Sequence, residues 1–246
     1  MKKYLCLIIS LLNAGATAIY IALIDKDIVP IHYDFYGNVD NEGSKWSFMS
    51  LPLILVVMAV MFLIIEKVII IEKVMAKNIN YQKNSKYLTI CITGFYVLMS
   101  AMFWVLLILS TNGNGKILSK AVPFVCSVIL GLIGVLFSNF MPKIKPNGTF
   151  GIRVSATLNN ETVWKKTHRF AGKTGMVGSF LVLITGFVSL FCGDFSAVVS
   201  IVGIVIFVVT IAVLPTIYAY RVKANMNKGQ ILFIYLQIIA KDNSSC

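Results

Sequence analysis

The chain has 246 residues, of which 58% are hydrophobic and 13% charged, with a net charge of +12 and a mean hydropathy of +0.83. This balance excludes an ordinary soluble domain and is typical of polytopic membrane proteins, so we expect no direct binding of nucleic acid. The five cysteines stand singly, without the paired spacing of a disulfide framework or a metal site, and no cofactor is predicted.

Six apolar runs approach or reach the roughly 20 residues that a helix needs to cross a bilayer. The sequence therefore predicts an all-α, polytopic, multi-pass membrane protein, a bundle of about six transmembrane helices. The first run is longer than the apolar core of a signal peptide and lacks a cleavage site, so we expect it to be retained. A seventh run, 231–240, is too short to span and is expected at the interface. The six runs cover residues 4–24, 48–71, 87–109, 121–140, 170–191 and 197–218.

The 22 lysines and arginines are distributed unevenly between the two sides that these spans define. Two lie at the N-terminus, five in the second loop, seven in the fourth loop and four in the C-terminal tail, whereas the opposite side receives four. By the positive-inside rule, both termini and the second and fourth loops are cytoplasmic, an N-in/C-in topology. Most of this charge then fixes topology and contacts anionic lipid headgroups.

The first outer loop, residues 25–46, forms the acidic face of the chain. Ile31 and Tyr33 alternate with His32 and Asp34, the period-two pattern of a short extended segment. Such a segment can accept a peptide strand along its edge, and the alternative is a solvated connector. The acids of this loop are Asp25, Asp27, Asp34, Asp40 and Glu42.

Small residues in the fourth and fifth runs predict close packing between these two helices. Near the end of the sixth run, Pro215 predicts a kink because proline removes a backbone donor. The small residues are Ser127, Gly131 and Gly134 in the fourth run and Gly172, Gly175, Gly178 and Gly186 in the fifth.

The polar segment 141–173 between the fourth and fifth runs contains seven of the 22 basic residues. Its prolines and an Asn-Gly pair predict turns, and Asn159 or Asn160 can then cap a helix. We expect this helix to be amphipathic and to lie in the cytoplasmic interface before the fifth span, with its apolar side in the acyl boundary and His168 at the border. Its apolar face comprises Val163, Trp164, Thr167, Phe170 and Ala171, and its basic face Lys165, Lys166, Arg169 and Lys173.

With those residues in view, the segment resembles the signature of the SdpI family, membrane immunity proteins against a secreted peptide toxin. The matching pieces are Asn139, Met141-Pro142-Lys143, Pro146-Asn147, Gly151-Ile152-Arg153, Thr157-Leu158, Val163-Trp164, Thr167-His168-Arg169 and Gly172. The outer loop is similar to the short module that often precedes this domain, in Pro30, His32, Tyr33, Gly37, Asp40, Ser44 and Lys45-Trp46.

This resemblance implies a bacterial plasma-membrane protein that meets a toxic peptide outside and can hold a transcriptional repressor inside. It also implies an N-terminal module over 1–75, an SdpI-like domain over 85–225 and a cytoplasmic tail over 226–246. The candidate ligand-binding residues outside are Pro30, His32, Asp34, Gly37, Asp40 and Trp46. The candidate partner-binding residues inside are Asn139, Pro142, Lys143, Pro146, Asn147, Gly151, Arg153, Trp164, Lys165, His168 and Arg169.

The chain departs from the family pattern at three places. Ser138 stands where the family commonly has glycine, and Asn147 is followed by Gly148 rather than by an aromatic residue. After Arg153, the usual Thr-Pro-Trp is replaced by Val154-Ser155-Ala156. A Pro-Trp pair would stiffen and anchor that turn, so immunity to the same toxin is not assumed.

A small permease is the alternative function. Against it, no run carries two or more charged residues deep in the hydrocarbon, and paired halves are not visible. An enzyme is not predicted, because His32 and His168 are expected on opposite sides of the bilayer and cannot share a metal or a proton relay. Glu161 is the sole carboxylate of the fourth loop, which leaves no acid pair.

Overall fold

The computed structural model describes residues 4–34, 38–76, 80–112, 115–147 and 150–243. Six helical segments in this part of the chain are long and apolar enough to cross a membrane, which confirms the predicted all-α polytopic bundle. The first five are α1 Leu5–Ala22, α2 Ser50–Ala76, α3 Asn80–Asn112, α4 Gly115–Phe140 and α6 Glu161–Ser189. The sixth is built from α7 Ser196–Val208, the π-helical turn η5 Val209–Val213 and α8 Leu214–Asn243.

The connections are short, and most carry a structure of their own. Between α1 and α2, the strands β1 Ile28–Tyr33 and β2 Val39–Ser44 form an antiparallel hairpin that is followed by the 3-10 turn η2 Lys45–Met49. This hairpin confirms the expected extended segment. Between α4 and α6 lie the 3-10 turn η3 Met141–Lys143 and the one-turn helix α5 Ser155–Leu158, and the 3-10 turn η4 Gly193–Phe195 leads into α7.

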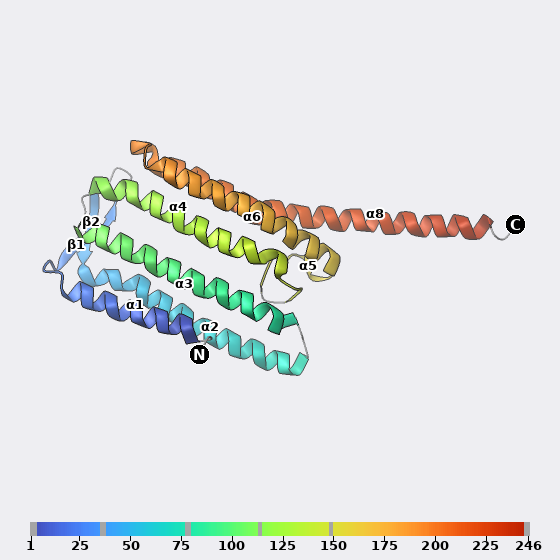
Figure 1. The fold of residues 1–246 in the computed structure, drawn as a ribbon, viewed down its shortest axis with the longest axis horizontal. Coiled ribbons are helices and arrows are strands. Elements are labelled where there is room, and N and C mark those ends of the chain that lie inside the picture. Colours follow the sequence, from blue (N-terminus) through green and yellow to red (C-terminus); the bar gives the residue numbers. More distant parts are fainter. Residues whose placement is uncertain (1–3, 35–37, 77–79, 113–114, 148–149, 244–246) are drawn as a thin grey trace.

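The helices lie side by side as long, nearly parallel rods, with the hairpin at one end of the bundle (Figure 1). α1 packs on α2 and α3, α3 packs on α4, and α4 packs on α6, which in turn contacts α7 and α8. The C-terminal part of α8 continues well beyond the opposite end of the bundle (Figure 1). The short run at 231–240 is therefore a continuation of this helix and not a separate element.

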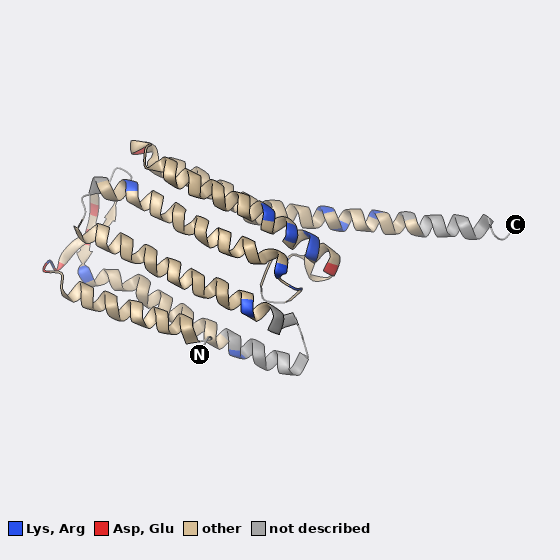
Figure 2. Cartoon of the chain, viewed as in Figure 1, with Lys and Arg blue, Asp and Glu red and all other residues tan. Residues whose placement is uncertain are grey.

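Charge is divided between the two ends as the topology rule predicts. Most of the described lysines and arginines lie at the end of the bundle away from the hairpin, along the start of α6 and the middle of α8 (Figure 2). Described acids occur at the hairpin end, and Glu161 stands at the opposite end (Figure 2). We therefore place the hairpin outside the cell and the α4–α6 loop in the cytoplasm.

The α4, α6 and α7 helices approach closely because small hydroxyl side chains rest on glycines of the neighbouring helix. A Cβ added at Gly175 would collide with Ser138 Oγ on α4, and one added at Gly178 would collide with Thr210 Oγ1. Thr210 needs no partner across the interface, since its hydroxyl donates to the carbonyl of Phe207 in its own span at 2.9 Å, whereas Ser138 Oγ is buried without a hydrogen-bond partner among the described residues. Similar contacts pair Ser179 with Gly134, Thr185 with Gly203 and Ser127 with Gly186.

The irregularity predicted at Pro215 takes the form of the π-helical turn Val209–Val213 directly before it. Proline has no N–H to donate to the carbonyl four residues earlier, and the wider turn accommodates this missing hydrogen bond. Thr210, which packs on Gly178, lies within the same turn. The turn therefore adjusts the sixth span at a point of close packing with α6.

Replacing Gly178 by leucine should destabilise the bundle, because the new side chain would have to displace Thr210 of η5 and would press on the backbone of α7 at Phe207. Overpacking of this kind costs about 1–3 kcal/mol. The measurement is thermal unfolding of the purified protein in detergent. Gly15→Leu on α1 is the matched control, since a Cβ at Gly15 meets nothing within 4 Å. Equal melting temperatures for the two variants would contradict this account of the packing.

Candidate functional site

The loop between α4 and α6 folds around two stacked rings, Trp164 and His168. Both come from the first turns of α6, one helical turn apart, and their ring centroids lie 4.1 Å apart with an interplanar angle of 15°. Trp164 is 0% exposed and His168 is 1% exposed. Met141 and Ile144 pack on Trp164, so the start of the loop covers the rings.

Each polar atom of the two rings is bound to backbone. Trp164 Nε1 donates to the Ile144 carbonyl at 2.9 Å. The N–H of Ile152 donates to His168 Nε2 at 3.1 Å, while His168 Nδ1 lies 2.9 Å from the Trp164 carbonyl. These partners require a neutral imidazole with its proton on Nδ1. With both nitrogens committed, His168 positions the loop and is not available as an acid or base.

Two glycines allow the loop to come this close to α6. Gly151 has a φ of +116°, a conformation that other residues rarely adopt. A Cβ at that position would also collide with His168 Nε2. Gly172 lies beneath Pro142, whose Cγ would be 2.6 Å from an added Cβ. Both matched glycines therefore serve the contact between the loop and the helix.

Two side chains of the loop, Asn147 and Thr157, fix the course of its backbone. Asn147 accepts from the Phe150 N–H at 2.7 Å and donates to the carbonyls of Lys145 and Phe150. The Thr157 hydroxyl donates to the carbonyls of Ile152 and Val154 and accepts from the Val154 N–H, so it fixes the last turn of the loop. The loop is thus held by specific hydrogen bonds along most of its described length, which makes it a rigid surface.

Asn84 of α3 is a structural residue that the sequence pattern did not reveal. It is 4% exposed, donates to the Lys145 carbonyl at 2.8 Å and accepts from the Lys145 N–H at 2.9 Å. Both bonds go to backbone 61 residues away. The surrounding Lys- and Asn-rich stretch is typical of a solvated connector, and no local signal marks this one amide as a buried link between α3 and the loop.

The expected interfacial helix is the first part of α6, continuous with the fifth span. The expectation that its apolar face lies in the acyl boundary is wrong. Val163, Trp164 and Thr167 are each 0% exposed and pack within the protein, and His168 is buried with them rather than at the border. The face is covered by the loop and by α8, because the loop supplies carbonyls and apolar side chains for it.

The structure divides the predicted cytoplasmic residues into a buried group and an exposed group. Trp164 and His168 are buried, and Pro146, Asn147 and Gly151 are partly buried in the loop. The exposed group forms a basic surface around the loop. Its members are Asn139, Pro142, Lys143, Arg153, Lys165 and Arg169.

Within the exposed group, Lys165 pairs with Glu161 at 2.8 Å, one helical turn away. Lys143 Nζ lies 5.1 Å from the centre of the Phe140 ring. The altered triplet Val154-Ser155-Ala156 leads into α5 and packs on α8: Ala156 lies with Ala219 and Val222, and Ser155 Oγ is 3.2 Å from the Tyr220 hydroxyl. The departure from the family pattern is thus located at the α5–α8 contact.

The outer candidate residues lie on the hairpin. His32 Nδ1 and Asp40 Oδ1 are 2.6 Å apart across the two strands, with side chains 68% and 45% exposed. Asp34 shapes the turn by accepting from the Asn38 N–H and Nδ2 at 2.8 and 2.9 Å. Partial burial raises the pKa of the Tyr33 phenol, which keeps this side chain neutral.

The remaining outer candidates have different surroundings. Pro30 is half-buried in β1 opposite Glu42. Trp46 is 51% exposed at the start of η2, where its backbone N–H donates to Ser44 Oγ. Gly37 lies outside the described residues. The outer and inner candidate sets are at opposite ends of the bundle, and the described residues contain no group of three or more His, Cys, Asp and Glu side chains that could hold a metal.

Replacing His168 by alanine should destabilise the loop, because the Ile152 N–H loses its acceptor and Trp164 loses its stacking partner. An unsatisfied buried donor alone costs about 1–3 kcal/mol. Thermal unfolding in detergent measures the loss. Arg169→Ala, which truncates the exposed neighbouring residue, is the control. A melting temperature for His168→Ala no lower than that of the control would rule out this structural role.

Comparison with known proteins finds a family model that matches most of this loop. Residues 143–219 match the model of the SdpI/YfhL protein family. The chain is also 30% identical over 92 residues to "Immunity protein SdpI" of Bacillus subtilis (strain 168), a stretch that makes up 37% of this chain and 42% of the relative. The match thus spans less than half of that relative's length. No solved structure matches significantly.

The family match begins at Lys143 and ends within α8, so it contains most of the loop, its two rings, α6 with its glycines, and α7. The resemblance seen in the sequence is confirmed over this region. The chain is a multi-pass protein of the bacterial cell membrane, and its residues 143–219 are similar to the SdpI/YfhL protein family.

Proposed function

We propose that this protein protects the cell against a secreted antimicrobial peptide and that its hairpin module, within residues 1–75, meets the peptide outside. Two observations carry the proposal: the similarity over 92 residues to an immunity protein, and the family match at residues 143–219, which include the Trp164–His168 stack. The acidic hairpin at the opposite end adds a surface suited to a cationic peptide.

The hairpin is held in a defined position, as a receiving surface must be. Lys45 anchors its base: Nζ donates to the Ile24 carbonyl at 2.8 Å and lies 3.3 Å from Asp27 Oδ1, and its N–H donates to the Asp27 carbonyl. Val29 is buried at 4% exposure beneath the strands. Because Lys45 fixes the base of the hairpin, the strands keep their position on the bundle and their exposed edge can still pair with an incoming peptide.

Electrostatic attraction and strand pairing would act together in such a complex. Asp40 and Glu42 both belong to β2 and are exposed. Asp40 is paired with His32, and Glu42 has no ion-pair partner within the described residues. A cationic peptide that adds to the hairpin would therefore meet carboxylates along the same strand, which favours encounter and fixes its register.

We further propose that the basic surface around the α4–α6 loop holds an acidic protein, such as a transcriptional repressor, at the membrane. Arg153, Lys165 and Arg169 are exposed and are carried on a backbone that is fixed by buried hydrogen bonds. Preorganised charges lose less conformational freedom on binding than charges on a mobile loop. The small permease stays the alternative, and substrate uptake by proteoliposomes above background would favour it.

Expression of the full chain in a peptide-sensitive strain tests the immunity proposal. The chain should raise the inhibitory concentration of at least one cationic secreted peptide, and Asp40→Asn should lower this protection about two- to fivefold, since an exposed charge contributes up to roughly 1 kcal/mol. Asp194→Asn, in the extracytoplasmic connection between α6 and α7, is the charge-matched control and should retain protection. Unchanged killing across a panel of peptides would argue strongly against immunity.

The inner proposal is tested with the product of an adjacent winged-helix repressor gene, where one is present. We expect it to co-purify with the full chain and to be lost from the Arg153→Gln/Arg169→Gln variant, with an effect that weakens at high salt because the contacts are exposed. Lys86→Gln, an exposed basic residue at the cytoplasmic part of α3, is the control. Equal recovery from both variants would exclude recognition by this surface.

A further inference from the structure

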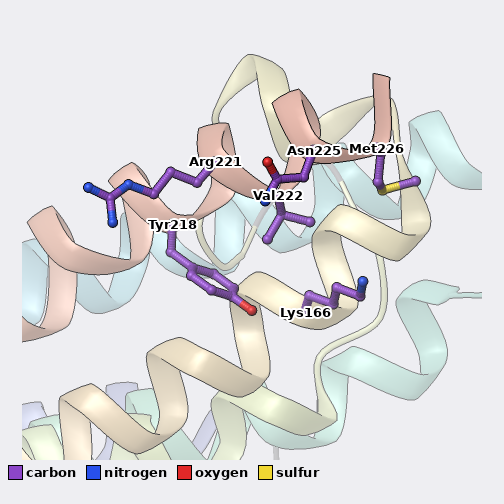
Figure 3. Close-up of a pocket in the computed structure, with 6 residues that line it drawn as sticks. All are labelled: Lys166, Tyr218, Arg221, Val222, Asn225 and Met226. Atoms are coloured by element: carbon purple, nitrogen blue, oxygen red, sulfur yellow. The ribbon is translucent and has the colours of Figure 1, made fainter. Parts of the chain in front are cut away.

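An open groove lies between the start of α6 and the first turns of α8, beside the loop but outside the candidate sites described above. Its volume is about 570 Å³. One wall comes from α6 and the other from α8, as Figure 3 shows. The lining residues are Lys166, Tyr218, Arg221, Val222, Asn225 and Met226.

The floor of the groove is apolar and fixed. The Tyr218 ring stacks on Phe170 of α6, with centroids 4.3 Å apart and an interplanar angle of 17°. Val222 belongs to the buried cluster that joins α5, α6 and α8, and Met226 packs against the same cluster. In Figure 3 the Tyr218 hydroxyl points toward the side of Lys166, so polar atoms lie at the rim above this floor.

The rim of the groove carries two positive charges that no described carboxylate neutralises. Neither Lys166 nor Arg221 forms an ion pair within the described residues, and the nearest carboxylate on this part of α6, Glu161, is engaged by Lys165. Arg221 extends on the far side of Tyr218 from Lys166 (Figure 3). Both side chains are exposed at their ends and long enough to turn toward a ligand, so the groove presents two cations and the Asn225 amide to an anion.

The groove lies at the depth where a lipid headgroup is found. Before it, Val213 of η5 and Leu214 and Ile217 of α8 are exposed on the apolar part of the span, and after it α8 carries Asn227 and Lys228. Tyr218 and Tyr220 stand between these two zones, the position in which aromatic residues mark the membrane interface. A ligand in the groove can therefore place acyl chains along the apolar helix surface and an acidic head beside Lys166 and Arg221.

We propose that this groove binds the headgroup of one anionic phospholipid, with the phosphate held by Lys166 and Arg221 and the glycerol region over Tyr218 and Val222. An apolar floor directly below two unpaired cations fits an amphipathic anion. An acidic protein segment would fit the charges but would leave the floor and the adjoining lipid-exposed helix surface unused.

The test uses the full chain reconstituted in nanodiscs of equal parts phosphatidylcholine and phosphatidylglycerol, then released for native mass spectrometry. Wild type should retain one phosphatidylglycerol in preference to phosphatidylcholine. Lys166→Gln/Arg221→Gln should reduce this retained lipid at least fivefold, whereas Lys166→Arg/Arg221→Lys should keep it. Lys86→Gln, which removes one charge at the cytoplasmic end of α3, is the control for bulk charge and should bind as wild type does.

Three outcomes would overturn the proposal. Equal retention of the two lipids, or an equal loss in Lys86→Gln, would show that the groove does not select an anionic headgroup. Displacement of the retained lipid by millimolar glycerol phosphate would show a simple anion site without acyl recognition. A thermal unfolding curve for each variant separates loss of the lipid from loss of the fold, and none of these measurements depends on immunity to a toxin.

Discussion

The stack of Trp164 on His168 is the contact on which the cytoplasmic half of the molecule depends. Three hydrogen bonds join these rings to the backbone, two of them to residues on the loop, at Ile144 and Ile152. Burying an indole N–H and an imidazole is favourable only when both are satisfied, so the rings dictate the path of the chain around them. The exposed basic residues then receive fixed positions as a consequence of this buried arrangement.

The family pattern acquires a physical meaning from this arrangement. Gly151 is required because the backbone turns through a positive φ against the imidazole, and Gly172 because Pro142 rests on it. Asn147 replaces missing backbone partners within the turn. The matched residues therefore preserve one loop conformation, while the surface that a partner would touch consists of the charges around it.

Much of the fold could be predicted from the sequence, and the limits are instructive. Hydrophobic length and charge asymmetry are local quantities, so the six spans and the extended segment in the outer loop were accessible. The environment of the first turns of α6 could not be predicted. An amphipathic pattern shows which face of a helix is apolar, but it does not show whether lipid or protein covers that face. Asn84 shows the same limit: its importance lies in a contact 61 residues away that no local pattern encodes.

The groove beside α8 could not be predicted from the sequence for a related reason. Its residues come from two helices, and its lysine and arginine have the same appearance in the sequence as basic residues that only fix the topology.

A further consequence comes from the π-helical turn that precedes α8. A rigid helix of 30 residues reaches roughly 45 Å at about 1.5 Å per residue. At that length, a tilt of about 10° at its base moves the far tip by about 8 Å. The sixth span is thus held at η5 by its packing on the glycines of α6, while α8 extends beyond the bundle. A small tilt at the packed part would therefore become a large displacement at the C-terminal end of α8.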